Sequence, residues 1–135
     1  MERIERSMAY KPEFALRVEV PELDPESPPV FVFGSADEAW MAMVGAIRRF
    51  GRANPEQSLD AMDFADWPAE LTSLAFRLVV DGVKDWSGVV GADGQELRFN
   101  KRELQDLPTN DKLRVCGAYL TKRAEVEAGK VMRGE

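Results

Sequence analysis

The chain has 135 residues, of which 44% are hydrophobic and 31% are charged, and its net charge is −6. This length and composition predict one domain with a hydrophobic core. Residues 1–70 hold 14 acidic and 7 basic residues, a balance that repels phosphate backbones, so we expect no nucleic-acid partner. Cys116 is the only cysteine and no run of about 20 apolar residues occurs, which predicts no internal disulfide, no membrane span and a cytoplasmic location.

Two strands are predicted near the N-terminus. Apolar and charged residues alternate over residues 14–20, which is the period of a half-buried strand. Four prolines and three acidic residues within residues 21–29 predict a loop with an acidic tip. Residues 30–33 read Val-Phe-Val-Phe, a second β-rich run, so together the two runs predict an antiparallel hairpin.

A helix is predicted after this hairpin, from about Ser35 to about Phe50. Ser35 and Glu38 have the spacing of a capping box, and Gly51 is a typical helix stop. Apolar residues at three- and four-residue spacing form one stripe on this helix: Trp40, Met43, Val44, Ile47 and Phe50.

A central helix is predicted to begin at Trp67-Pro68, with Asp66 close enough to help cap it. Its apolar residues surround more than one side, so we expect it to be buried on several faces. The helical pattern continues to the turn at Ser87-Gly88. Two alternatives stay open for the preceding segment 56–64, a short helix or an irregular connection.

The C-terminal part is predicted to contain a small hairpin and two helices. The hairpin spans residues 89–99, where short β-rich runs flank a turn with glycines. Asn100 and Glu103 form a second capping box, which opens a short helix ended by Pro108. A last helix follows.

These elements predict an α+β fold: a mainly helical single domain with an N-terminal antiparallel β-hairpin and a second short hairpin before the C-terminal helices. The globular domain is predicted to span residues 13–125. Residues 1–12 are highly charged and residues 126–135 have little apolar content, so both ends are predicted to be flexible.

The sequence contains few groups suited to catalysis. It has no histidine, which removes Ser-His and Cys-His pairs and histidine metal ligands. Cys116 lies on the apolar face of the last helix and is interpreted as a core residue. Asp60, Asp63 and Asp66 would share one helix face that could bind a divalent cation, although a solvated surface is the favoured interpretation. We expect no enzyme, no metal and no cofactor. A small enzyme or a metal-dependent regulator that uses the Asp60/Asp63/Asp66 face is the least favoured hypothesis.

Trp86 lies beside the predicted turn, and two interpretations of it stay open. It either anchors a protein partner or folds back onto the small hairpin and seals the core. Trp86, Phe99 and Tyr119 are the residues that we predict to bind a partner.

Three stretches stand in an informative order. They are Phe14-Ala-Leu-Arg-Val-Glu-Val-Pro21 followed by Val-Phe-Val-Phe, Val79-Val-Asp-Gly-Val-Lys-Asp-Trp86 followed by Leu97-Arg-Phe-Asn100, and Ala118-Tyr119-Leu120. In this order they resemble the tail assembly chaperones of long-tailed (siphophage-type) phages and prophages, over roughly residues 12–128. The chain departs from many of these relatives after its second strand, where it lacks their basic continuation.

The resemblance implies a chaperone that binds the tape-measure protein and recruits tail-tube subunits in the host cytoplasm before the tube polymerises. Such chaperones are generally absent from the finished particle. A structural virion protein, such as a tail-completion or head–tail connector component, is the alternative, and self-association stays open.

Overall fold

β1 (Leu16–Glu19) and β2 (Val30–Phe33) form the antiparallel hairpin that the sequence predicts. The structure is a computed structural model and describes the backbone of residues 16–132 and the side chains of residues 16–129. Val18 pairs with Phe31 and both are buried, whereas Arg17 and Glu19 are exposed. The alternation therefore turns one face of the hairpin towards the core. Residues 1–12, predicted to be flexible, lie outside the described residues.

A third strand, β3 (Val83–Ser87), pairs antiparallel with β2 and gives the sheet order β1-β2-β3. The predicted central helix continues over these residues, and this prediction is wrong. The helix ends at Gly82, whose backbone oxygen accepts a 2.8 Å hydrogen bond from Gly34 N. Because this bond and the pairing with β2 join distant segments, the local pattern of apolar residues did not reveal them.

α2 (Asp37–Ala53) begins and ends differently from the prediction. Its N-cap residue is Ala36, and no described side chain caps this end, so the predicted Ser35–Glu38 capping box does not form. The helix also continues through Gly51 to Ala53, three residues beyond the predicted end. Its buried residues are Ala39, Met43 and Ala46, whereas most of the predicted stripe is only partly buried.

The connection after α2 is irregular, which excludes a short α-helix over residues 56–64. It contains two single 3₁₀ turns, η2 (Leu59–Ala61) and η3 (Phe64–Asp66). α3 (Ala69–Gly82) follows, with Pro68 at its N-cap and no side-chain cap from the described residues, so Asp66 does not cap it.

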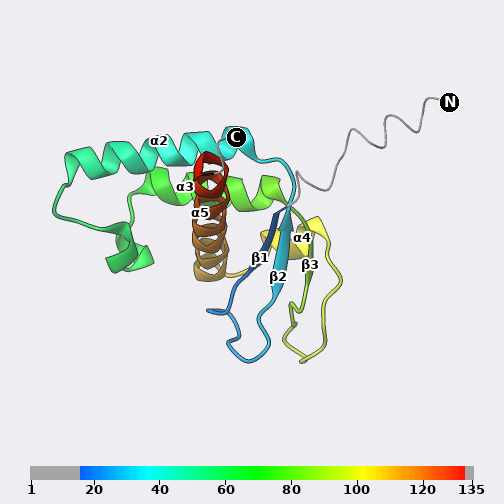
Figure 1. Cartoon of the computed structure of the whole chain (residues 1–135). Coiled ribbons are helices and arrows are strands. Elements are labelled where there is room, and N and C mark those ends of the chain that lie inside the picture. Colours follow the sequence, from blue (N-terminus) through cyan, green and yellow to red (C-terminus); the bar gives the residue numbers. More distant parts are fainter. Residues whose placement is uncertain (1–15, 133–135) are drawn as a thin grey trace.

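α3 is the central helix that the sequence predicts. It packs against α2 and against α5 (Thr109–Met132), and more loosely against α4 (Lys101–Gln105). Leu71, Ala75, Leu78 and Val79 on α3 are buried. Figure 1 shows α2 and α3 side by side with α5 crossing them and the sheet beyond.

The C-terminal elements largely follow the prediction. The second hairpin is reduced to one bridge, between Val90 and Glu96. Asn100 caps α4 as expected, because its Oδ1 accepts a 2.9 Å hydrogen bond from Glu103 N. α5, however, continues as a helix to Met132 through most of the predicted flexible tail, residues 126–135.

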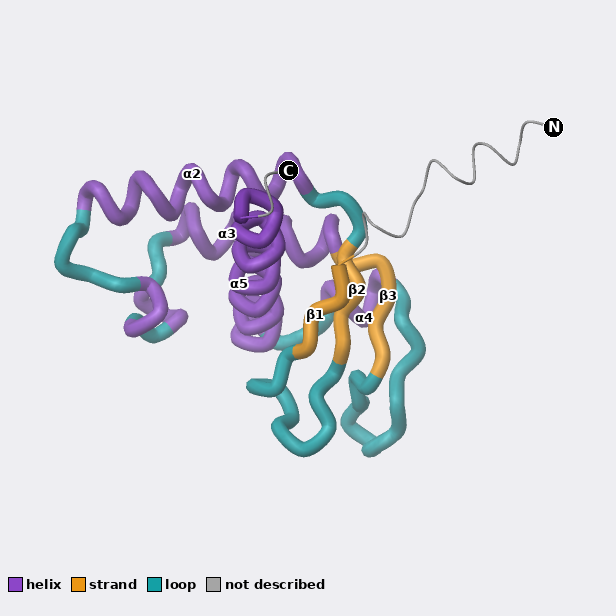
Figure 2. The backbone as a smooth tube through the Cα atoms, viewed as in Figure 1, coloured by secondary structure: helices purple, strands orange, loops and turns teal. Residues whose placement is uncertain are grey.

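The molecule is thus an α+β domain, 55% helical, with a three-stranded antiparallel sheet. Figure 2 shows the strands at one end of the helices, with the 20–29 and 88–99 loops extending from the same end of the sheet. The sheet and helices enclose one core, in which Phe33 of β2 stacks on Tyr119 of α5 at 4.2 Å between ring centroids. Within residues 16–132, no helix has the length and apolar content needed to cross a membrane.

Candidate functional site

Trp86 lies inside the molecule. Its side chain is 6% exposed, and its Nε1 donates a 3.0 Å hydrogen bond to the backbone oxygen of Leu97. The ring meets Phe31 and Phe99 edge to face, with centroids 5.9 and 5.1 Å away. Of the two interpretations of Trp86, the structure therefore supports the one in which it folds back onto the small hairpin and seals the core.

The three residues predicted to bind a partner do not form one surface. Phe99 is half-buried against Trp86, whereas Tyr119 packs on Phe33 and is 2% exposed. In this arrangement Trp86 and Tyr119 offer almost no surface to another protein. Partner binding by these residues stays a prediction, and each has a packing role that the contacts explain.

The three aspartates that suggested a cation site do not share a helix face. Asp60 lies in η2, Asp66 in η3, and Asp63 between them, and all three are exposed. Among the described side chains, no group of three or more His, Cys, Asp or Glu residues is arranged to hold a metal ion.

Cys116 is fully buried in α5, as the sequence predicts for a core residue. Burial raises the pKa of its thiol to about 12. Because the thiolate is the nucleophilic form, the thiol is held in its unreactive state near neutral pH.

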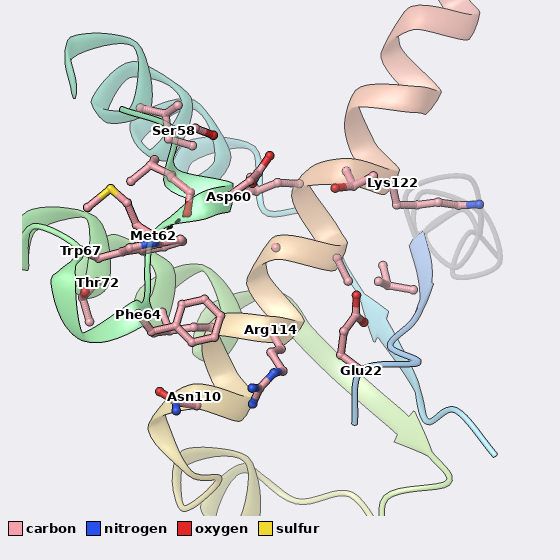
Figure 3. A pocket seen from close by; sticks show the side chains of 18 of the residues that line it. Glu22, Ser58, Asp60, Met62, Phe64, Trp67, Thr72, Asn110, Arg114 and Lys122 are labelled. Carbon is pink, nitrogen blue, oxygen red and sulfur yellow. Dashed lines mark hydrogen bonds between the residues drawn. The ribbon is translucent and has the colours of Figure 1, made fainter. Parts of the chain in front are cut away.

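A broad concavity of about 1800 Å³ lies over the exposed face of α5 (Figure 3). The irregular connection and the end of α2 form one wall, and β1 with the beginning of the 20–29 loop forms the other. The floor runs along α5 from Thr109 to Glu125. We call this surface the α5 groove. It is the candidate functional site.

The wall formed by the irregular connection is held together by aromatic side chains. Trp67 Nε1 donates a 3.3 Å hydrogen bond to the backbone oxygen of Leu59, and Phe64 meets Trp67 edge to face at 5.5 Å. The guanidinium of Arg114 on α5 lies 5.6 Å from the Phe64 ring centroid, a cation–π distance. These contacts fix a segment without regular structure, and Met62, Phe64 and Trp67 give it a half-buried apolar lining.

Charged side chains surround this apolar lining. Asp60 and Asp63 lie on the wall formed by the connection, and Glu22 and Lys122 lie on the opposite side of α5 (Figure 3). An apolar centre with a charged rim is the usual arrangement of a protein-binding surface. The groove is therefore suited to reversible contact with another polypeptide.

The groove has no clear signature in the sequence. Its wall comes from a segment with no clear period, and its floor comes from the face of α5 opposite the core. One signal was present, because Gly117 lies inside the last predicted helix, at a position where alanine would favour the helix.

Comparisons with known proteins give no further information about function. No protein-family model matches the chain, and no curated protein or solved structure matches it either.

Proposed function

We propose that the protein is a non-enzymatic assembly chaperone of phage tail morphogenesis. It binds a tape-measure or tail-tube polypeptide in the host cytoplasm and keeps it from premature assembly. The order of the three sequence stretches supports the family. The α5 groove is the observation that supports a binding role.

The groove has the physical properties that a chaperone needs. Its apolar lining, including Met62, Phe64 and Trp67, is half-buried, so it adds binding energy without exposing a large hydrophobic patch. Its charged rim steers and orients a partner more than it tightens the complex. Such a surface favours a complex that forms readily and can be released when the tube is built.

Co-expression tests the proposal. The protein is expressed with the tape-measure protein, or with the tail-tube protein, from the same phage or prophage. We expect at least one of them to co-purify with it, and we expect purified particles to lack the protein by mass spectrometry. No binding to either protein would contradict the proposal. If each particle contained as many copies of the protein as one ring of subunits needs, the connector alternative would be favoured.

Two methionines offer a matched pair for locating the contact. Met62 is half-buried and lines the groove, whereas Met41 is 62% exposed on α2 and lies outside it. We expect Met62→Ser to weaken co-purification and Met41→Ser to leave it unchanged. Equal effects of the two substitutions would exclude the groove as the binding surface.

A further inference from the structure

We propose that the α5 groove receives a basic amphipathic helix of about four turns from the partner. This inference rests on the binding role proposed above and adds the shape and charge of what is bound. Three features of the groove carry it: its open glycines, the form of its floor and the balance of its charges.

Two helical glycines, Gly51 in α2 and Gly117 in α5, line the groove. A Cβ added to either glycine would have no described atom within 4 Å other than those of its two chain neighbours and of the adjacent backbone of its own helix. Gly82 differs, because a Cβ there would lie 2.8 Å from Phe33 Cδ2, so packing within this chain requires that glycine. Glycine destabilises a helix relative to alanine. Packing among the described residues does not require glycine at Gly51 or Gly117, as it does at Gly82. Their bare backbone permits close approach by another chain.

The floor favours a helix as the occupant. It is one helix face with small residues at Gly117, Thr121 and Ala124, at four- and three-residue spacing. Helices pack closest where the side chains at the contact are small. An extended peptide could pair only with the edge strand β1 on one wall of the groove, because the backbone of the helical floor is already bonded. The lining from Thr109 to Glu125 corresponds to roughly 24 Å, or between four and five turns.

The charges favour a basic occupant. The charged lining consists of five acidic and three basic residues: Glu19, Glu22, Asp60, Asp63, Glu125, Arg17, Arg114 and Lys122. One of the basic residues, Arg114, is partly neutralised by Asp111, because its Nη1 lies 3.6 Å from Asp111 Oδ1. Lysines or arginines beside the apolar stripe of the bound helix would therefore meet an excess of carboxylates. A second copy of this chain fits less well, because each copy carries a net charge of −6.

Three synthetic peptides of about 18 residues test the shape and charge. The first is an amphipathic helix with an Ala/Leu stripe flanked by lysines, the second replaces these lysines with glutamates, and the third places prolines in the first. Binding to the full chain is measured by fluorescence anisotropy. We expect the basic helix to bind at least about tenfold more tightly than either other peptide, and more weakly as salt is added. Equal binding of the acidic or the proline-containing peptide overturns the proposal.

Substitutions at Gly117 locate the binding site. Gly117→Trp places a large ring over the floor, whereas Gly117→Ala adds one methyl group in open space. We expect Gly117→Trp to weaken binding of the basic helix at least about tenfold, Gly117→Ala to weaken it less, and Met41→Ser, which lies outside the groove, to retain it. Circular dichroism verifies that the variants fold. If Gly117→Trp is poorly folded, the double charge reversal Asp60→Lys with Asp63→Lys on the exposed wall serves instead, and it is expected to reverse the preference for lysine over glutamate.

Unchanged binding in Gly117→Trp, or an unchanged preference for lysine in the double charge reversal where that variant is used, would overturn the inference. A stable dimer in analytical ultracentrifugation that Gly117→Trp dissociates would also overturn it. The two proposals fail separately. If the basic peptide binds in the groove but no tape-measure or tube protein does, the function is wrong and the groove inference stands. If such a protein binds but Gly117→Trp has no effect, the reverse holds.

Discussion

At the scale of single residues, burial assigns the roles of Trp86 and Cys116. Trp86 lies beside a turn, which suggested an anchor for a partner, yet its indole bonds to Leu97 and closes the space beneath the small hairpin. Desolvation by burial is the cause of the raised pKa of Cys116. Both side chains stabilise the fold from inside.

The raised pKa of Cys116 predicts a specific dependence of stability on pH. The unfolded thiol has the ordinary pKa of 9.0 and the folded thiol one of about 12, so as the pH rises the unfolded chain loses its proton first. The thiol's contribution to stability is therefore fully present below about pH 9 and is lost above it. Relative to Cys116→Ala, we expect the free energy of unfolding to fall by about 1.4 kcal/mol between about pH 8 and about pH 10.

Urea unfolding of the wild type and Cys116→Ala at the two pH values measures this difference. Other titrating groups are shared by the two proteins and cancel. A difference in unfolding free energy that stays constant over this range would show that the thiol is not desolvated in the folded state.

At the scale of elements, the two predicted capping boxes have different outcomes. Asn100 Oδ1 accepts a hydrogen bond from Glu103 N and caps the start of α4. In α2 the N-cap residue is Ala36, and Ser35 lies one residue before it. Only Gly34 separates Ser35 from the end of β2, and Gly34 N donates a hydrogen bond to the backbone oxygen of Gly82. The path of the chain out of the sheet, and not the capping preference of serine, fixes the start of α2.

These two positions provide a prediction with an internal control. We expect Asn100→Ala to lower the free energy of unfolding by about 1 kcal/mol, because an unsatisfied amide is left at the start of α4. We expect Ser35→Ala to change it by less than about 0.5 kcal/mol, since an exposed serine makes no cap. Chemical denaturation of both variants checks the pair, and comparable losses would contradict the assignment of the caps.

Arg123 fastens α5 to the first turn of α2. Its Nη1 donates a 2.8 Å hydrogen bond to the Tyr119 hydroxyl, its Nη2 donates a 2.7 Å bond to Asp37 Oδ1, and its guanidinium lies 4.1 Å from the Trp40 ring centroid. Partial burial lowers the pKa of Arg123, but the bonds to Tyr119 and Asp37 outweigh this and hold the pKa above its ordinary value. The contact is charge-assisted and partly shielded from water, and both properties strengthen it.

Arg77 on α3 is the matched control for Arg123. Its side chain is 53% exposed against 18% for Arg123, and its nearest carboxylate oxygens, on Asp81 and Glu38, lie 3.7 and 4.0 Å away. We expect Arg123→Ala to cost about 2 kcal/mol of unfolding free energy and Arg77→Ala less than about 0.5 kcal/mol. Thermal and urea unfolding measure the stability of both variants. A larger loss of unfolding free energy in Arg77→Ala than in Arg123→Ala would contradict the role given to Arg123 in holding α5 against α2.

At the scale of the whole molecule, the same helices close the core on one side and leave the α5 groove open on the other. Gly82 marks the closed side, where α3 meets Phe33 of the sheet and Ala36 before α2. Gly117 marks the open side, on the face of α5 away from the core. A methyl group added at each position therefore probes the two sides separately.

We expect Gly82→Ala to destabilise the protein by about 2 kcal/mol, because the new Cβ would overlap the Phe33 ring. We expect Gly117→Ala to stabilise it by about 0.5–1 kcal/mol, because the helix gains and nothing described is displaced. Urea unfolding at constant pH measures both. A loss of stability in Gly117→Ala would mean that other atoms of the protein already fill the space over the groove floor at this position.

The sequence by itself determined the elements whose causes are local. Alternation of apolar and charged residues was sufficient for β1, the Val-Phe-Val-Phe run for β2, the Asn100–Glu103 pair for the start of α4, and helical spacing for the burial of Cys116. Each of these signals depends on residues within a few positions of one another, so chain neighbours decide the outcome.

Only the tertiary structure decided β3, the place of Trp86 and the α5 groove. β3 exists because β2 offers it a strand to pair with some fifty residues earlier in the chain, although its own residues continue a helical pattern. Trp86 is buried because the 88–99 loop returns over it, and the groove forms because an aperiodic segment is fastened opposite one face of α5. These features depend on contacts between distant segments, and the energy of such contacts is set by packing and not by the local pattern of residues.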